Sequence, residues 1–357
     1  MPKFKASHKT ALFIVAVGVL SAPVAAQTQQ QPQAPAPPTY DAKQQQAQQP
    51  PSQTGALQVT GAAPSDDKAL PPEKPKLKIN HVLIISEDGL RADAVATMHL
   101  HWHDLLRHHG SYSDHAMTIR DASTLPAHAS MLSGVQPSVH GLTWNTWRPH
   151  AGYIKTPTIF TEATEAGLST AFFTGKTKLR HIVPPGSVAM YDRPGYYCKK
   201  VAEEAANYLM TEKPTLAFVH FSDPDDAGHA KGWMSSPQKN AIAHSDQCLG
   251  IIYEALEKSG LIDDTLLIVT ADHGGHNRVH SGAKRIDREI PWIACGPGVR
   301  EDYVLPDPPS TLDTAATALY ALGLPISAEV TGKPRTDIFA ELPYGLSPLA
   351  VTPAVAK

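Results

Sequence analysis

Short apolar runs recur along the chain, and each ends at glycine, proline or a polar cluster. Runs of this length that are rich in β-branched and aromatic residues are typical of buried strands, whereas the longer segments between them carry the spacing of amphipathic helices. This alternation predicts an α/β fold with a mostly parallel central sheet and helices on both faces. The expected strands are residues 81–86, 169–173, 216–221, 266–270 and 292–295, and the clearest helices are 199–209 and 238–258.

Three of these strands end in carboxylates. Asp88 follows the first strand, Asp225 the third, and Asp272 with His273 the fourth. Open α/β sheets place their sites at the carboxyl ends of strands, and carboxylate oxygens and imidazole nitrogens suit zinc. His229 follows Asp225 by four residues, a spacing that puts both on one face of a helical turn. One such carboxylate could equally be a helix N-cap, but three together predict a metal site.

Thr124 stands at the head of a segment that can begin a helix, with Pro126 in its first turn. A structural interpretation makes Thr124 an N-cap. A functional interpretation makes it a hydroxyl that loses its proton on metal coordination and acts as a nucleophile. A helix N-terminus at this point would also favour the negative charge of a phosphoryl group.

Five motifs occur in a characteristic order: Asp88-Gly89, Thr124-Leu-Pro-Ala-His128, His140-Gly141 with Asn145, Asp225-x-x-Gly228-His229 and Asp272-His273-Gly274. In this order they resemble the type I phosphodiesterases/nucleotide pyrophosphatases of the alkaline phosphatase superfamily, over roughly residues 78–338. The resemblance implies an alkaline-phosphatase-like fold and a metal-dependent hydrolase that cleaves phosphodiester or nucleotide pyrophosphate bonds. Its substrate would be a small phosphate ester or nucleotide. Sulfatases of the superfamily instead carry Cys/Ser-x-Pro-x-Arg, and the cofactor-independent phosphoglycerate mutases use serine.

The same resemblance implies a cofactor of two zinc ions, although other divalent metals would also suit the ligands. Threonine would attack phosphorus while the two ions stabilise the attacking and leaving oxygens. The third ligand of the second ion would be a late histidine, for which His280 fits best and His276 is the alternative. The implied ligands are Asp88, Thr124, Asp272 and His273 for one ion, and Asp225, His229 and His280 for the other.

Substrate-binding residues follow from the resemblance as well. Asn145 would hydrogen-bond a phosphoryl oxygen together with the Thr124 amide, which suits the chemistry of an amide donor. Lys176 and Lys178 occupy the place where threonine-nucleophile phosphomonoesterases carry Lys-x-Arg. Lysine lacks the bidentate fork of arginine, so a diesterase is expected, and a phosphomonoesterase or a catalytically silent metal-binding homologue is the alternative. A solvated charge cluster is the structural interpretation of the two lysines.

The N-terminal region has the organisation of a secretory signal peptide. Residues 1–10 are basic, residues 11–20 are apolar but short for a membrane span, and Ala26 ends a small-residue cleavage site. The expected organisation is a signal peptide at 1–26, a disordered Gln/Pro/Ala-rich linker at 27–75, a catalytic domain at 76–342 with a small lid near 184–197, and a flexible tail at 343–357. The protein is therefore expected to be periplasmic or secreted, without a stable membrane span after cleavage.

The composition of the chain limits the binding partners and the number of disulfides that can be expected. A formal net charge of −3 gives no electrostatic reason to bind a nucleic-acid polymer. Three cysteines are too few for a disulfide framework, although one bridge is possible. The histidines at positions 99, 101, 103, 108 and 109 are expected on a solvated helix face. Nothing in the sequence specifies an oligomeric state.

Overall fold

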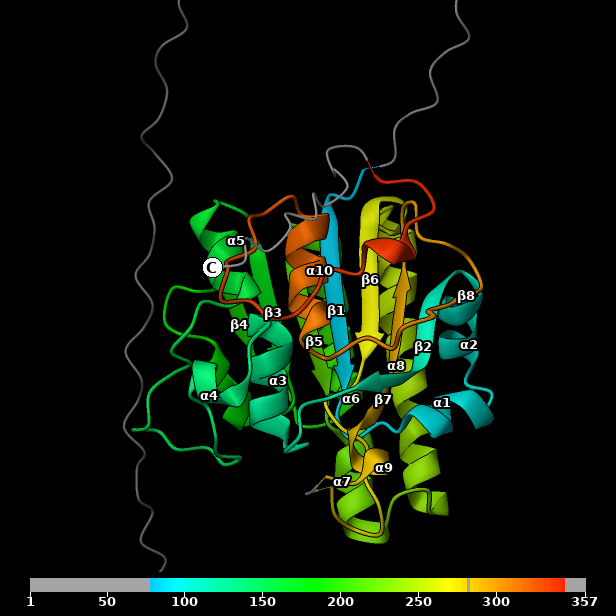
Figure 1. Ribbon diagram of the computed structural model, residues 1–357. Helices are drawn as coiled ribbons and strands as arrows, with labels where there is room; N and C mark the ends of the chain where they lie inside the picture. The colour runs from blue at the N-terminus through cyan, green and yellow to red at the C-terminus, as the bar shows by residue number, and fades with distance from the viewer. Residues whose placement is uncertain (1–77, 281–282, 344–357) are drawn as a thin grey trace, which may run out of the picture. The chain divides into compact units, whose positions relative to one another are not determined.

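The computed structural model describes residues 78–280 and 283–343. Its centre is an eight-stranded sheet with the order β4-β3-β5-β1-β6-β7-β2-β8 (Figure 1). Neighbouring strands are parallel except at β7, which runs antiparallel to β6 and to β2. The strands are β1 (His81–Glu87), β2 (Gly110–Met117), β3 (Thr170–Thr174), β4 (Met190–Asp192), β5 (Leu216–Phe221), β6 (Thr265–Thr270), β7 (Glu289–Cys295) and β8 (Tyr303–Val304).

Helices cover both faces of this sheet. In Figure 1, α3, α5 and α10 lie on the near face, and α6 and α8 lie behind the strands. α7 and α9 lie beyond the carboxyl ends of β1 and β6. The helices are α1 (Ala92–Thr97), α2 (His101–His108), α3 (Thr124–Ser133), α4 (Pro137–His140), α5 (Ile159–Glu165), α6 (Cys198–Glu212), α7 (Asp223–Lys231), α8 (Ser236–Ser259), α9 (Arg285–Arg288) and α10 (Asp313–Ala321), with short 3₁₀ turns at Thr177–Ile182, Ile262–Asp264 and Thr336–Ile338.

The predicted α/β class is confirmed, and all five expected strands are present with small differences at their ends. The central strands β5 and β6 are buried along their whole length, which explains their largely apolar sequences. β2 was not predicted because its Ser, Asp and His residues hide the pattern, and β4 and β8 are only three and two residues long. β4 falls within residues 184–197, the segment of the expected small lid, and it pairs with β3 at the edge of the sheet.

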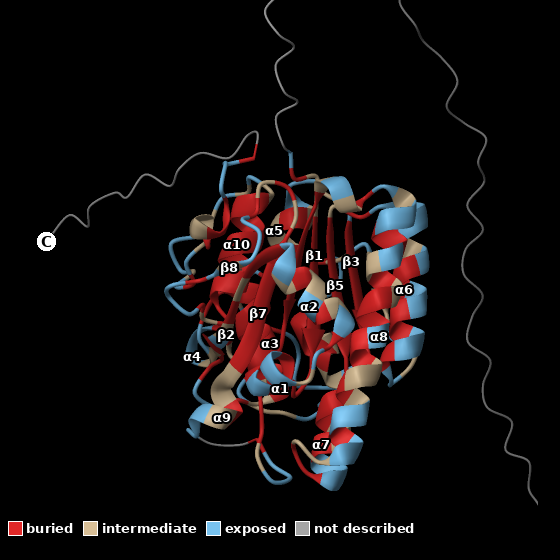
Figure 2. Cartoon of the chain, turned by 90° about the vertical axis from the view of Figure 1, so that its right-hand side faces the viewer, coloured by how far each residue is buried: buried red, intermediate tan, exposed pale blue. Residues whose placement is uncertain are grey.

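Burial follows this layered arrangement (Figure 2). The strands at the centre of the sheet are buried, and the short edge strands β4 and β8 are partly exposed. α6 and α8 bury one side and expose the other, as expected for helices that pack on a sheet. Among the described residues, no helix combines the length and apolar character needed to cross a membrane. The predicted signal peptide and linker, and all of the predicted tail except Pro343, lie outside the described residues.

One of the histidines expected on a solvated helix face is instead fully buried. His103, in α2, places Nε2 3.1 Å from Oε1 of Glu87 and Nδ1 2.8 Å from Oδ1 of Asp246. Burial lowers its pKa, but Glu87 and Asp246 outweigh burial and raise the pKa to about 9. The expectation failed because both carboxylates come from other elements, and charge pairing allowed the imidazole to be buried.

Candidate active site

Three strand ends meet at the centre of the sheet because β1 lies between β5 and β6. Asp88 directly follows β1, Asp225 lies in the first turn of α7 after β5, and Asp272 is the second residue after β6. Gly89 allows their close approach: its φ is +73°, and a Cβ there would lie 2.8 Å from the Cα of Asp225. The Gly89 amide also donates to Oδ1 of Asp272 at 3.1 Å.

The first group of side chains surrounds Nε2 of His273. This nitrogen lies 3.4 Å from Oδ1 of Asp88 and 3.3 Å from Oδ2 of Asp272. Oγ1 of Thr124 lies 3.4 Å from the same nitrogen. All four side chains are fully buried. The structure thus brings together the four residues that the sequence predicts around one ion.

The second group consists of Asp225, His229 and His280. Nε2 of His229 lies 3.3 Å from Oδ1 of Asp225, one helical turn earlier in α7. Nε2 of His280 lies 3.9 Å from the same oxygen. The alternative, His276, is held elsewhere: its Nδ1 lies 2.7 Å from Oδ1 of Asp287, and its Nε2 accepts from Lys284 at 2.7 Å.

The three histidines of the two groups share one hydrogen-bonding pattern. Nδ1 of His229 lies 2.9 Å from the Arg278 carbonyl oxygen. Nδ1 of His273 lies 2.8 Å from the Gly274 carbonyl oxygen, and Nδ1 of His280 lies 2.7 Å from the Ala122 carbonyl oxygen. Because a carbonyl only accepts, each Nδ1 donates its proton to that carbonyl, and each ring turns its Nε2 toward the site. Metal-binding histidines are commonly oriented in this way.

The carboxylates also have unused acceptor atoms. Oδ1 of Asp88, Oδ1 of Asp225 and Oδ2 of Asp272 are buried without a hydrogen-bond partner. Lys176 contacts the opposite oxygens of two of them, with Nζ 2.8 Å from Oδ2 of Asp88 and 2.5 Å from Oδ2 of Asp225. Buried charges need a partner or a metal ion, and one ammonium cannot balance three carboxylates.

The titration behaviour reflects this imbalance. Burial raises the pKa of Asp88, but the Lys176 ammonium and His220 outweigh burial and hold it well below its ordinary value. The pKa of Asp272 shifts in the opposite direction: burial, and then the Asp88 carboxylate, raise it well above the ordinary value. Burial, and then His280, lower the pKa of His273 to about 3. The donor set, with free carboxylate oxygens and imidazoles whose Nε2 atoms face them, therefore fits divalent cations.

Thr124 is the first residue of α3, a helix buried along its whole length. The N-cap is Ser123, so the structural interpretation of Thr124 as the cap is wrong. Its neighbour Leu125 donates its amide to Oδ1 of Asn145 at 3.0 Å, and Nζ of Lys178 donates to the same oxygen at 3.0 Å. Asn145 and Lys178 are thereby held beside the helix N-terminus that carries Thr124.

A pocket of about 380 Å³ opens beside these groups. Asp225, His229 and His280 form one part of its lining, and Lys176, Lys178 and Asn145 form another. Trp147 and Tyr196 also line the pocket, and these residues are 41% and 39% exposed. The structure thus places the metal-ligand candidates and the substrate-binding candidates on one cavity.

Some residues that support the site were not predicted. Nε2 of His220 donates to Oδ2 of Asp88 at 2.8 Å. His128 lies 2.9 Å from Ser86 Oγ and 3.4 Å from Oδ2 of Asp272. His128 ends the motif Thr124-Leu-Pro-Ala-His128, and its position four residues after Thr124 could have indicated that it lies on the same side of the helix. His220 sits inside a buried strand, where a polar residue is unusual and indicates a specific partner.

Fold and site together define an α/β protein of the alkaline phosphatase superfamily. The family model of type I phosphodiesterase/nucleotide pyrophosphatase matches residues 82–288, more than half of the chain. The chain belongs to this family.

Solved structures with the same fold include murine ectonucleotide pyrophosphatase/phosphodiesterase 5, at 14% identity and a TM-score of 0.64, over 73% of this chain and 100% of that one. An inactive form of that protein has been solved with AMP. A phosphonate monoester hydrolase from Silicibacter pomeroyi has a TM-score of 0.56 at 17% identity, covering 76% of this chain and 78% of that one.

Sequence relatives include the 2,3-bisphosphoglycerate-independent phosphoglycerate mutase of Onchocerca volvulus, 32% identical over 178 residues, which cover 46% of this chain and 33% of the mutase. The corresponding enzyme of Brugia malayi is 30% identical over 165 residues, covering 44% of this chain and 31% of the mutase. The chain spans about a third of the length of these curated relatives.

Proposed function

We propose that this protein is an exported hydrolase that cleaves phosphodiester or nucleotide pyrophosphate bonds with Thr124 as nucleophile and two zinc ions as cofactor. Family membership supports the reaction class. The observation that carries the finer proposal is the orientation of His229, His273 and His280, each of which turns its Nε2 toward carboxylate oxygens that lack a partner.

Two sets of residues would hold the ions. Asp88, Asp272 and His273, with Thr124, would hold one, and Asp225, His229 and His280 the other, in agreement with the two groups of donors that converge in the fold. When the ions bind Asp88 and Asp225, Lys176 would leave these two carboxylates and face the substrate instead. When bound, the two ions would act as Lewis acids and stabilise negative charge on the attacking and leaving oxygens.

The protein residues would divide the remaining work. Oγ1 of Thr124 attacks phosphorus in line with the leaving oxygen and forms a phosphothreonine ester, which water then hydrolyses. Asn145 uses Oδ1 to accept from Leu125 and Lys178, so its Nδ2 group can donate to a non-bridging oxygen together with the Thr124 amide. Trp147 and Tyr196 offer apolar surface at the pocket rim for the organic part of a substrate.

A nucleotide substrate is supported by one relative of similar fold, which has been solved with AMP. A phosphomonoesterase is the second candidate, because Lys176 and Lys178 both line the pocket and could balance the extra charge of a monoester. The N-terminal sequence supports export to the periplasm or the exterior, with the catalytic domain at 76–342 joined to the signal peptide by the linker.

The test is a comparison of kcat/KM for matched aryl phosphodiester, aryl phosphomonoester and dinucleotide pyrophosphate substrates, with metal content measured on the same preparation. We expect about two zinc ions per chain and a preference for the diester or pyrophosphate. A tenfold preference for the monoester, about 1.4 kcal/mol in transition-state binding, would instead establish the second candidate.

A further inference from the structure

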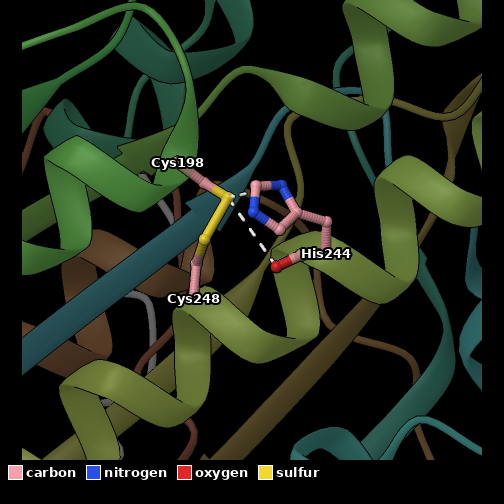
Figure 3. A group of neighbouring side chains, drawn as sticks. All are labelled: Cys198, His244 and Cys248. Atoms are coloured by element: carbon pink, nitrogen blue, oxygen red, sulfur yellow. Dashed lines mark hydrogen bonds between the residues drawn. A yellow bond between two sulfur atoms is a disulfide. The ribbon is translucent and has the colours of Figure 1, made fainter.

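A third group of potential ligands lies between α6 and α8 and has no part in the proposed hydrolysis. Cys198 and Cys248 form a disulfide there, with Cα atoms 5.9 Å apart. Nδ1 of His244 lies 3.6 Å from Sγ of Cys198 (Figure 3). One ligand atom from each of the three residues lies within 4.8 Å of the others. Two thiolates and one imidazole form a donor set that proteins use for zinc.

We propose that, in the reduced protein, Cys198, Cys248 and His244 bind one thiophilic divalent cation of the zinc type. The ion then joins α6 to α8 in place of the disulfide. This site is separate from the two groups at the strand ends, and it does not depend on the proposed function.

The helices position the three ligands for a common ion. His244 and Cys248 are one turn apart in α8, so both side chains lie on the same face of that helix. Cys198 approaches this face from α6, of which it is the first residue. The N-terminus of this 15-residue helix favours a negative thiolate over a neutral thiol, as a metal ligand requires.

Neighbouring contacts orient the imidazole and leave a route for the ion. Oδ1 of Asp223 lies 3.3 Å from Nδ1 of His244, and Oδ2 of Asp223 accepts from the Cys198 amide at 2.7 Å. Asp223 therefore places Nδ1 of the ring beside the sulfur atom, and a cation bound at Nδ1 takes the place of the proton in this contact, which moves to Nε2. The His244 side chain is 44% exposed, whereas both cysteines are buried, so an ion would enter from the side of His244.

Disulfide and ion exclude each other because they use the same sulfur electrons. A dithiol reductant gives two electrons and two protons to the S–S bond, which breaks into two thiols while the reductant closes to its own disulfide. Binding of the cation then releases the two thiol protons to solvent. Oxidation of the two thiolates restores the S–S bond and expels the ion.

Cobalt(II) distinguishes this site from the proposed catalytic ions, whose ligands are carboxylates, imidazoles and a hydroxyl. Only thiolate ligation gives intense sulfur-to-cobalt absorption in the near ultraviolet. The full chain is freed of metal, reduced with a phosphine that supplies the same two electrons, and titrated with cobalt. At saturation we expect the intensity of this band to correspond to about one thiolate-bound cobalt per chain in the reduced protein, and we expect no such band in the oxidised protein.

Two variants test the proposed ligands, and a third serves as a control. Cys248→Ser should remove the band, and His244→Ala, at a half-exposed position, should weaken cobalt binding about tenfold or more. Cys295→Ser is the matched control, because Cys295 is a buried free thiol in β7, and it should leave the band unchanged. Folding of each variant is checked by circular dichroism. The proposal is overturned if reduced wild type shows no band, if the band persists in Cys248→Ser, or if His244→Ala binds cobalt as tightly as wild type.

Discussion

The imidazole rings of His273 and His280 lie parallel, with their centroids 3.7 Å apart and an interplanar angle of 4°. His273 belongs to the group around Asp88, and His280 belongs to the group around Asp225. The stacked pair therefore joins the two proposed metal sites, so that two ions bound by these rings would be near neighbours, as in-line displacement requires.

The first prediction separates His280 from His276. His280→Ala should lower the zinc content from about two ions per chain to about one, because it removes an Nε2 that faces Asp225. His276→Ala is the control, since its ring contacts Asp287 and Lys284 instead, and it should retain both ions. Equal metal loss in the two variants, measured by elemental analysis on folded protein, would contradict the assignment.

Thr124→Ala should lower kcat by about a thousandfold or more, because the attacking oxygen is lost while the carboxylates and imidazoles remain. Metal content should stay near the wild-type value, since Thr124 would supply one ligand among four. Thr124→Ser, which restores a hydroxyl, should recover part of the rate. Near-wild-type turnover by the alanine variant would exclude Thr124 as the nucleophile.

Chelation should inactivate the enzyme, and added zinc should restore activity as the second of about two ions per chain is bound. The physical reason is that three buried carboxylates would lose their neutralising charge and the attacking oxygen its activation. The measurement is activity against bound zinc during reconstitution. Full activity in protein shown to be metal-free would rule out the proposed cofactor.

Lys178→Ala should reduce kcat/KM for an aryl phosphomonoester more than for the matched diester, because the monoester carries the additional charge that this cation faces. Lys178→Arg should improve the monoester in particular, since guanidinium can form two parallel hydrogen bonds. Lys199→Ala, at an exposed position in α6, is the control and should change neither rate. Equal losses on both substrates would mean that Lys178 does not select between them.

His103 should make stability depend on pH. Its pKa rises from 6.5 to about 9 on folding, so its stabilising effect is complete below pH 6.5 and is lost as pH rises through 9. The difference corresponds to about 3 kcal/mol. In His103→Gln, this part of the pH dependence should vanish, whereas His108→Gln, at an exposed position in the same helix, should keep it. Denaturant unfolding across this pH range measures the difference, and identical profiles for wild type and His103→Gln would refute it.

The sequence predicted the parts of the site that depend on short spacings. Asp88 and Asp272 could be found because each comes shortly after an apolar run in a strand, and the pair Asp225 and His229 because four residues make one helical turn. The order of the motifs then indicated the family.

Features that depend on distant partners could not be predicted in the same way. The choice between His280 and His276 rests on which ring meets Asp225, and the burial of His103 rests on Glu87 and Asp246. Lys176 was expected to face the substrate, and its contacts with two carboxylates arise only when β3 lies beside β5. Such contacts are set by packing across the sheet and leave no local pattern in the chain.

The position of β1 between β5 and β6 also determines when, during synthesis of the chain, the candidate active site can first form. Gly89 bonds to Asp272 across 183 positions of the chain, so a polypeptide still being synthesised holds Asp88 and Thr124 long before the strand that completes their surroundings. Contacts of such long range form late, after the entropy of closing the intervening chain has been overcome. An unfinished or truncated chain would therefore hold an incomplete set of ligands, and hydrolysis would begin only once the last central strand is in place.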